Sequence, residues 1–147
     1  MWGQDKSQLA TKIQTLQNKA LRIINFMPPR ESANPLFFDS KIMKFDDVVK
    51  SQTCLFAYSF SHRNLPTALN SLFTPIMEIH DHKTKFAEVK LHLNRTNTVK
   101  YGSNSIQSKV VSTWNEVLNL VEEHPLLTSK KKFKEILEDL LIKTYKS

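Results

Sequence analysis

Residues 9–27, LATKIQTLQNKALRIINFM, carry the pattern that decides the fold. Apolar residues recur there at steps of four and three, which places them in one stripe along a helix. Pro28 and Pro29 end the helix, because proline lacks the N–H that would continue it. An isolated helix of this length is only marginally stable, so we expect the rest of the chain to bury the stripe. This apolar stripe consists of Leu9, Ile13, Leu16, Ala20, Ile23 and Met27.

A second row follows the same rhythm one residue earlier in the sequence. Long cationic and amide side chains dominate it, so the helix is expected to bury one side and to present a basic edge beside it. The row consists of Gln8, Lys12, Thr15, Lys19 and Arg22.

Composition limits the class of protein. The 147 residues suffice for one domain with a real core, and 21 basic against 14 acidic residues give a net charge of +7, which favours a polyanionic partner. The single cysteine, Cys54, excludes an internal disulfide and fits a reducing compartment. No apolar run is long enough to span a bilayer, and no signal peptide is recognisable. We therefore expect an intracellular protein that is not secreted and has no membrane partner, with nucleus or cytoplasm left open.

Periodicity predicts the rest of the fold. Helical spacing recurs over 45–61, over 106–121, and in a last helix that begins near 128 or 129. Between them, Val89, Leu91 and Leu93 alternate with polar residues, which is typical of a half-buried strand. The sequence therefore predicts a mostly α-helical bundle with a small β-hairpin insertion around 89–105. We expect residues 1–73 to form the bundle, and 74–147, the basic hairpin and C-terminal helices, to pack on it as one compact unit.

The middle of the chain concentrates positive charge. Residues 80–109 contain six basic and two acidic residues, with Thr, Ser and Asn between them. That mixture suits contacts to phosphate oxygens, although a solvated hairpin would have the same composition. Lys130, Lys131 and Lys132 crowd the start of the last helix, where the dipole disfavours cations. Both a nearby anion and a solvated lysine cluster remain open there.

Catalytic and metal chemistry find no support. His80-Asp81-His82, considered with His92, has a metal-like pattern, but its two histidines at i and i+2 lack a clear third ligand. Only two glycines occur, too few for a phosphate-binding loop. Adjacent carboxylates such as Asp46 and Asp47 point about 100° apart on a helix, so they do not converge on a substrate. We predict no catalytic residues, no metal and no cofactor. Cys54 and Trp114 are interpreted as core residues.

Several short motifs occur in an order that resembles one family. The chain is similar, over nearly all of its length, to the region that follows the polymerase palm in non-LTR retrotransposon reverse transcriptases, the jockey-like group in particular. The motifs are LQNKALRII at 16–24, Pro35-Leu36-Phe37, Phe56-Ala57-Tyr58, Leu65-Pro66, His80-Asp81-His82 before Thr84-Lys85, Arg95-Thr96, YGSNSI at 101–106, Trp114-Asn115, and 129–137 with Phe133-Lys134.

This resemblance implies a thumb and C-terminal extension without the catalytic palm, in which a helical bundle holds the template–primer duplex. Lys19 and Arg22 match basic positions of the first motif, and Arg95, Thr96 and Trp114 match recurrent positions of the later segment. The chain departs from the family at two positions. Lys85 stands where arginine usually follows threonine, which loses bidentate reach, and Asn119 stands where proline is common.

We therefore expect a non-catalytic fragment of an RNA-directed DNA polymerase that binds an RNA–DNA hybrid or duplex through backbone phosphates, without sequence specificity. Two alternatives remain. One is a helical protein-interaction module, whose residues Leu9, Ile13 and Leu16 would be exposed and dock on a polymerase palm domain or a second copy. The other is an inactive transposon relic. The candidate nucleic-acid-binding residues are Lys12, Lys19, Arg22, Lys83, Lys85, Arg95 and Lys100.

Overall fold

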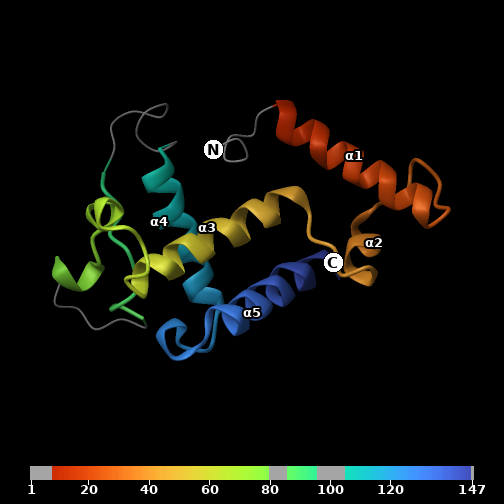
Figure 1. Cartoon of the computed structure of the whole chain (residues 1–147). Helices are drawn as coiled ribbons and strands as arrows, with labels where there is room; N and C mark the ends of the chain where they lie inside the picture. Colours follow the sequence, from red (N-terminus) through yellow and green to blue (C-terminus); the bar gives the residue numbers. More distant parts are fainter. Residues whose placement is uncertain (1–7, 80–85, 96–104, 147) are drawn as a thin grey trace. The chain divides into compact units, whose positions relative to one another are not determined.

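The computed structural model describes residues 8–79, 86–95 and 105–146, and these residues are mostly helical, as the sequence predicts. Short 3-10 turns connect the helices, among them η1 (Thr67–Leu72), η2 (Ile76–Glu78), η4 (Pro125–Leu127) and η5 (Thr144–Lys146). The α-helices, shown in Figure 1, are α1 (Gln8–Ile24), α2 (Asn34–Asp39), α3 (Phe45–Ser61), α4 (Ile106–Leu120) and α5 (Lys130–Lys143).

The chain packs as two units. The first contains Met1–Ser51 together with Glu135–Ser147, and the second contains Gln52–Lys134. Helices α3 and α5 each contribute residues to both units, because the boundaries fall inside them.

The core of the first unit forms where α2 contacts both α1 and η5. Leu21 of α1, Phe37 of α2 and Tyr145 of η5 are buried together. The rings of Phe37 and Tyr145 meet edge to face with 6.1 Å between their centroids. A proline in the first turn of α2 suits that position, since its missing N–H has no partner there in any helix.

The predicted burial of the apolar stripe is wrong. Met27 is partly buried against the first core, but the other five stripe residues are exposed. Leu16 and Ile23 are 63% and 75% exposed, whereas the buried residues of α1 are Ala10 and Leu21. Helix α1 is therefore rotated relative to the prediction, and its apolar side faces outward.

Two glutamines explain why α1 packs in this way. Gln14 and Gln17 lie on the inward side, and their Oε1 atoms both accept a hydrogen bond from the N–H of Phe45, each at 3.0 Å. Gln17 also donates from Nε2 to the carbonyl oxygen of Met43 at 3.1 Å. The first N–H groups of a helix have no partner within it, so these amides satisfy the start of α3.

Helices α1, α2 and α3 end in the same way. In each, a residue other than glycine takes a left-handed conformation just after the helix: Phe26 (φ 54°), Lys41 (φ 51°) and Arg63 (φ 54°). The next residue then donates its N–H to a carbonyl five positions back, as from Met27 to Arg22 at 2.8 Å. This is the Schellman arrangement, in which glycine is the usual left-handed residue.

The core of the second unit is aromatic. The predicted burial of Cys54 and Trp114 is confirmed, since both are 0% exposed. Phe133 stacks on Tyr58 with 5.0 Å between centroids and contacts Trp114 at 5.8 Å. The hydroxyl of Tyr58 donates to the carbonyl oxygen of Thr128 at 2.6 Å, and burial raises the pKa of this hydroxyl.

The predicted hairpin around 89–105 is not supported. The structure describes residues 89–95 and 105 of this range, and no strand occurs among them. Leu91 instead forms one isolated antiparallel bridge with Pro75. The alternation that suggested a strand is a real alternation of burial, because Val89 and Leu91 are buried, although Leu93 is 50% exposed.

One edge of this extended segment pairs with the backbone of residues 74–76, and side chains of α4 hold the other edge. The amide of Asn115 donates to the carbonyl oxygen of Leu91 at 2.7 Å and accepts from the N–H of Leu91 at 3.0 Å. Trp114 donates from Nε1 to the carbonyl oxygen of Val89 at 2.7 Å. One amide side chain thereby replaces the pair of hydrogen bonds that a neighbouring strand would supply.

Candidate nucleic-acid interface

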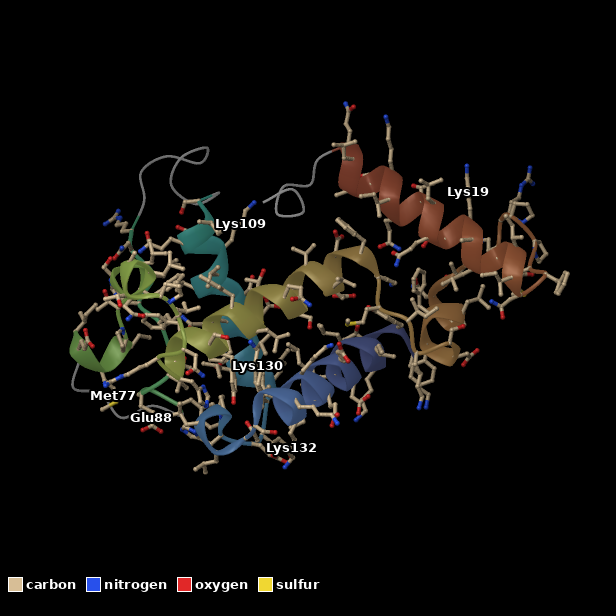
Figure 2. The ribbon with its side chains drawn as sticks, viewed as in Figure 1. Lys19, Met77, Glu88, Lys109, Lys130 and Lys132 are labelled. Carbon is tan, nitrogen blue, oxygen red and sulfur yellow. The ribbon has the colours of Figure 1, made fainter. Side chains whose placement is uncertain are left out.

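The basic edge of α1 is accessible, as predicted. Lys12 and Lys19 are exposed, and Arg22 is half-buried. Figure 2 shows Lys19 projecting from the side of α1 that faces away from α2. Residues three and four apart are neighbours on a helix surface, so Lys19 and Arg22 are adjacent, and Lys12 is two turns away from Lys19 on the same side.

No carboxylate neutralises this edge within the described residues. Helix α1 contains no aspartate or glutamate, and two ion pairs of the described residues, His124–Glu88 and Lys132–Glu123, lie elsewhere. Arg22 does have one partner, since its Nε donates to the carbonyl oxygen of Glu31 at 2.8 Å. A guanidinium has five N–H groups, so this bond leaves Arg22 with four donors for a phosphate.

The other four predicted contacts cannot be compared with the α1 row in this structure. Arg95 is exposed, but it belongs to the second unit, so its addition to the α1 row stays a prediction. Lys83, Lys85 and Lys100 lie outside the described residues. The structure therefore brings together three of the seven candidate residues, Lys12, Lys19 and Arg22.

Two of the three lysines at the start of α5 have partners from their own unit. Lys130 donates to the hydroxyl of Ser59 at 3.1 Å, and Lys132 lies 2.6 Å from the Glu123 carboxylate. Lys131 is exposed. Lys130 and Lys132 are labelled at this end of α5 in Figure 2. The cluster is thus partly compensated by intramolecular contacts, and an external anion is not needed to explain it.

A hollow of about 470 Å³ opens in the second unit. Phe60 and Phe73 line it together with Arg63, Glu78 and Glu88. One lining residue, Glu88, is paired with His124, whose Nε2 faces that carboxylate while its Nδ1 accepts the N–H of Leu126 at 3.2 Å. This pair orders the chain before α5, and no hydroxyl or thiol nucleophile is placed beside the imidazole by these contacts.

Among the described residues, no group of three or more histidine, cysteine, aspartate and glutamate residues is arranged to hold a metal ion. His80, Asp81 and His82 lie outside those residues.

The leading expectation from the sequence missed the exposure of the apolar stripe, which adjoins the basic edge; only the protein-interaction alternative had Leu9, Ile13 and Leu16 exposed. Lys12 lies between Leu9 and Leu16 on the helix surface, and Lys19 lies between Leu16 and Ile23. The polar Gln14 and Gln17 on the inward side were the available signal, because two long amides can occupy an inward face when they cap a neighbouring helix.

None of the helices described here combines the length and the apolar character needed to cross a bilayer. In comparisons with family models, curated proteins and solved structures, nothing matches the chain.

Proposed function

We propose that this chain is a non-catalytic, nucleic-acid-binding part of an RNA-directed DNA polymerase that contacts template–primer backbones through the basic edge of α1. The observation that carries the proposal is the exposure of Lys12 and Lys19 on a helix without carboxylates. Because no acidic side chain competes for them there, a polyanionic backbone can approach both ammonium groups. Arg22 adds donors beside Lys19.

Contacts of this kind predict affinity without sequence readout. Ammonium and guanidinium groups that meet phosphates release condensed counterions, so the association constant falls with salt by a log–log slope of about −0.9 for each phosphate neutralised. The three α1 cations alone predict a slope of about −3 for a duplex. Contacts from Lys83, Lys85, Arg95 and Lys100 would steepen it to about −6.

The test is a salt titration of an RNA–DNA hybrid against the 147-residue chain and two double charge reversals. The variant Lys12→Glu with Lys19→Glu removes the proposed contacts. The control, Lys131→Glu with Lys143→Glu, changes the net charge equally at exposed positions of α5.

We expect the α1 variant to lose about two units of slope and the control to keep the slope of the parent chain. If both variants bind the hybrid equally more weakly, the loss follows from net charge alone and not from the position of the lysines on α1. A parent chain with no salt dependence would contradict phosphate contacts altogether. Far-UV circular dichroism of both variants checks that their helices are retained.

A further inference from the structure

The exposed part of the apolar stripe is an apolar surface outside either core. Leu9 and Ile13 are 56% and 42% exposed, and Leu16 and Ile23 more so. Phe26, which follows the end of α1, is 96% exposed as well. Isolated exposed apolar residues are ordinary, but a contiguous row on one helix side marks an interaction surface.

The spacing of the row fits another helix. From Leu9 to Ile23 the steps are four, three, four and three, which is the heptad rhythm by which side chains of one helix fit between those of a partner. Ala20 near the middle permits a close approach of the two backbones. A seam of this kind is narrower than the apolar side of a helix that lies in a membrane interface.

The charge beside the row selects the partner. Lys12 and Lys19 occupy the flanking position of the heptad rhythm on one side of the seam. Helix α1 has no carboxylate that could pair with them. Carboxylates at the flanking positions of a partner helix would meet these ammonium groups, as charges beside coiled-coil seams do.

A second copy of α1 is a poor occupant of this surface. An antiparallel pair would bring Lys12 and Lys19 of the two copies against each other, and like charges at these positions repel. A parallel pair would place the lysines opposite Gln17 and Ile24, which carry no charge. Neither arrangement provides an opposite charge, so self-pairing lacks the complementarity that an acidic helix has.

We propose that α1 docks, through its exposed apolar stripe, a helix of a partner protein that carries an apolar seam flanked by carboxylates. The stripe supplies the area buried on docking, and Lys12 with Lys19 sets the preference for an acidic partner. Lys12 and Lys19 are shared with the proposed phosphate contacts, but the stripe can be tested separately, because Leu16 and Ile23 play no part in holding a nucleic-acid backbone.

The probe is a designed three-heptad peptide with leucine at both seam positions and glutamate at the flanking positions, compared with the same peptide carrying lysine. Fluorescence anisotropy of each labelled peptide is measured while the full chain is added. We expect the glutamate peptide to bind about tenfold more tightly than the lysine peptide. Lys12→Glu with Lys19→Glu should reverse that preference.

Leu16→Gln and Ile23→Gln test the stripe without changing charge. Each should weaken the glutamate peptide about tenfold, because a buried leucine or isoleucine contact is lost, and should leave the affinity for an RNA–DNA hybrid within about twofold. The hybrid measurement separates this inference from nucleic-acid binding. Both positions are exposed, and two variants are used so that misfolding of one does not decide the result.

Three outcomes would overturn the proposal: no binding of either peptide, equal binding of both, or unchanged peptide affinity in both glutamine variants. Sedimentation equilibrium checks the competing occupant. A dimer of the parent chain that dissociates on Leu16→Gln would assign the stripe to a second copy instead.

Discussion

The hydroxyl of Tyr145, in the last turn of the chain, donates a hydrogen bond to the carboxylate of Asp47 in the first turn of α3. The same oxygen accepts the N–H of Lys44 at 3.1 Å, and the Lys44 ammonium lies 4.3 Å from the centre of the Tyr145 ring. The η5 turn is thereby fastened to the start of α3.

Removing this hydroxyl should destabilise the protein. We expect Tyr145→Phe to lower the free energy of unfolding by about 1–3 kcal/mol, because Asp47 and the Lys44 N–H both lose a partner. Urea unfolding followed by circular dichroism measures the change. Asp47→Asn should also destabilise, and more than Asp46→Asn, which removes a charge from the same helical turn but is exposed. Equal costs for the two asparagine variants would mean that only the helix dipole matters there.

The same hydroxyl should make stability fall at alkaline pH. Burial, and then the hydrogen bond to Asp47, raise the pKa of Tyr145 above its ordinary value of 10. A raised pKa means that the folded state holds the proton more tightly, so the associated stability is complete below pH 10 and is lost as the pH rises toward the folded-state pKa. Urea midpoints measured between about pH 8 and 11 should therefore drop less in Tyr145→Phe than in the parent chain. Some decline should persist, since burial also raises the pKa of Tyr58.

Part of this fold follows from local sequence signals. The range 45–61 predicted for one helix coincides with α3, because Asp46 and Asp47 lie in its first turn and apolar residues recur throughout. The sequence also predicted the burial of Cys54 and Trp114, because each lies among apolar residues at helical spacing. The exposure of Lys12 and Lys19 was predictable because the row containing them has no apolar member.

Other features depend on partners distant in the sequence. Periodicity placed the apolar residues of α1 on one stripe, but it does not say which side of a helix turns inward when Gln14 and Gln17 can cap another helix. Similarly, the alternation around Val89 and Leu91 predicted burial correctly, but not that the partner would be the Asn115 side chain. Such contacts arise from tertiary packing, which local patterns do not encode.

Asn115 should contribute far more to stability than Asn119, which lies one turn later on α4. We expect Asn115→Ala to cost about 1–3 kcal/mol of unfolding free energy, because the buried N–H and carbonyl of Leu91 lose their partner. Asn119→Ala removes only an exposed contact with Lys90 and should change stability by less than about 0.5 kcal/mol. Thermal unfolding of the two variants compares them directly. Similar costs at both positions would show that the amide does not replace a strand.

The orientation of α1 can be tested with two leucines of the same helix. Leu21→Ala should lower the unfolding free energy by about 2–5 kcal/mol, because Leu21 is 5% exposed and packs in the first core. Leu16→Ala, at 63% exposure, should change it by less than about 0.5 kcal/mol. The two substitutions remove the same atoms, so denaturant midpoints report burial alone. A larger loss of unfolding free energy for Leu16→Ala than for Leu21→Ala would mean that α1 buries its apolar stripe after all.

Phe26 combines an unfavourable backbone conformation with an exposed ring, and replacing it should separate stability from docking. A left-handed conformation costs a residue with a Cβ about 1–2 kcal/mol, and glycine avoids this cost but loses more chain entropy on folding. We therefore expect Phe26→Gly to raise the unfolding free energy by about 0.5–1 kcal/mol. Phe86 is also left-handed (φ 60°), but its ring centroid lies 5.0 Å from that of His124, so replacing it would remove a packing contact as well. Phe26 is the better position for this test because it is 96% exposed.

If the ring of Phe26 serves the docking surface, the gain in stability should accompany a loss of affinity for the glutamate-flanked peptide. Lys41→Gly is the matched control, since Lys41 is left-handed after α2 and is not part of the stripe. It should gain similar stability and keep the parent affinity, as measured by thermal unfolding and peptide anisotropy. Phe26→Gly with higher stability and unchanged affinity would exclude the ring from docking, while unchanged stability in both variants would show that the left-handed positions carry no cost.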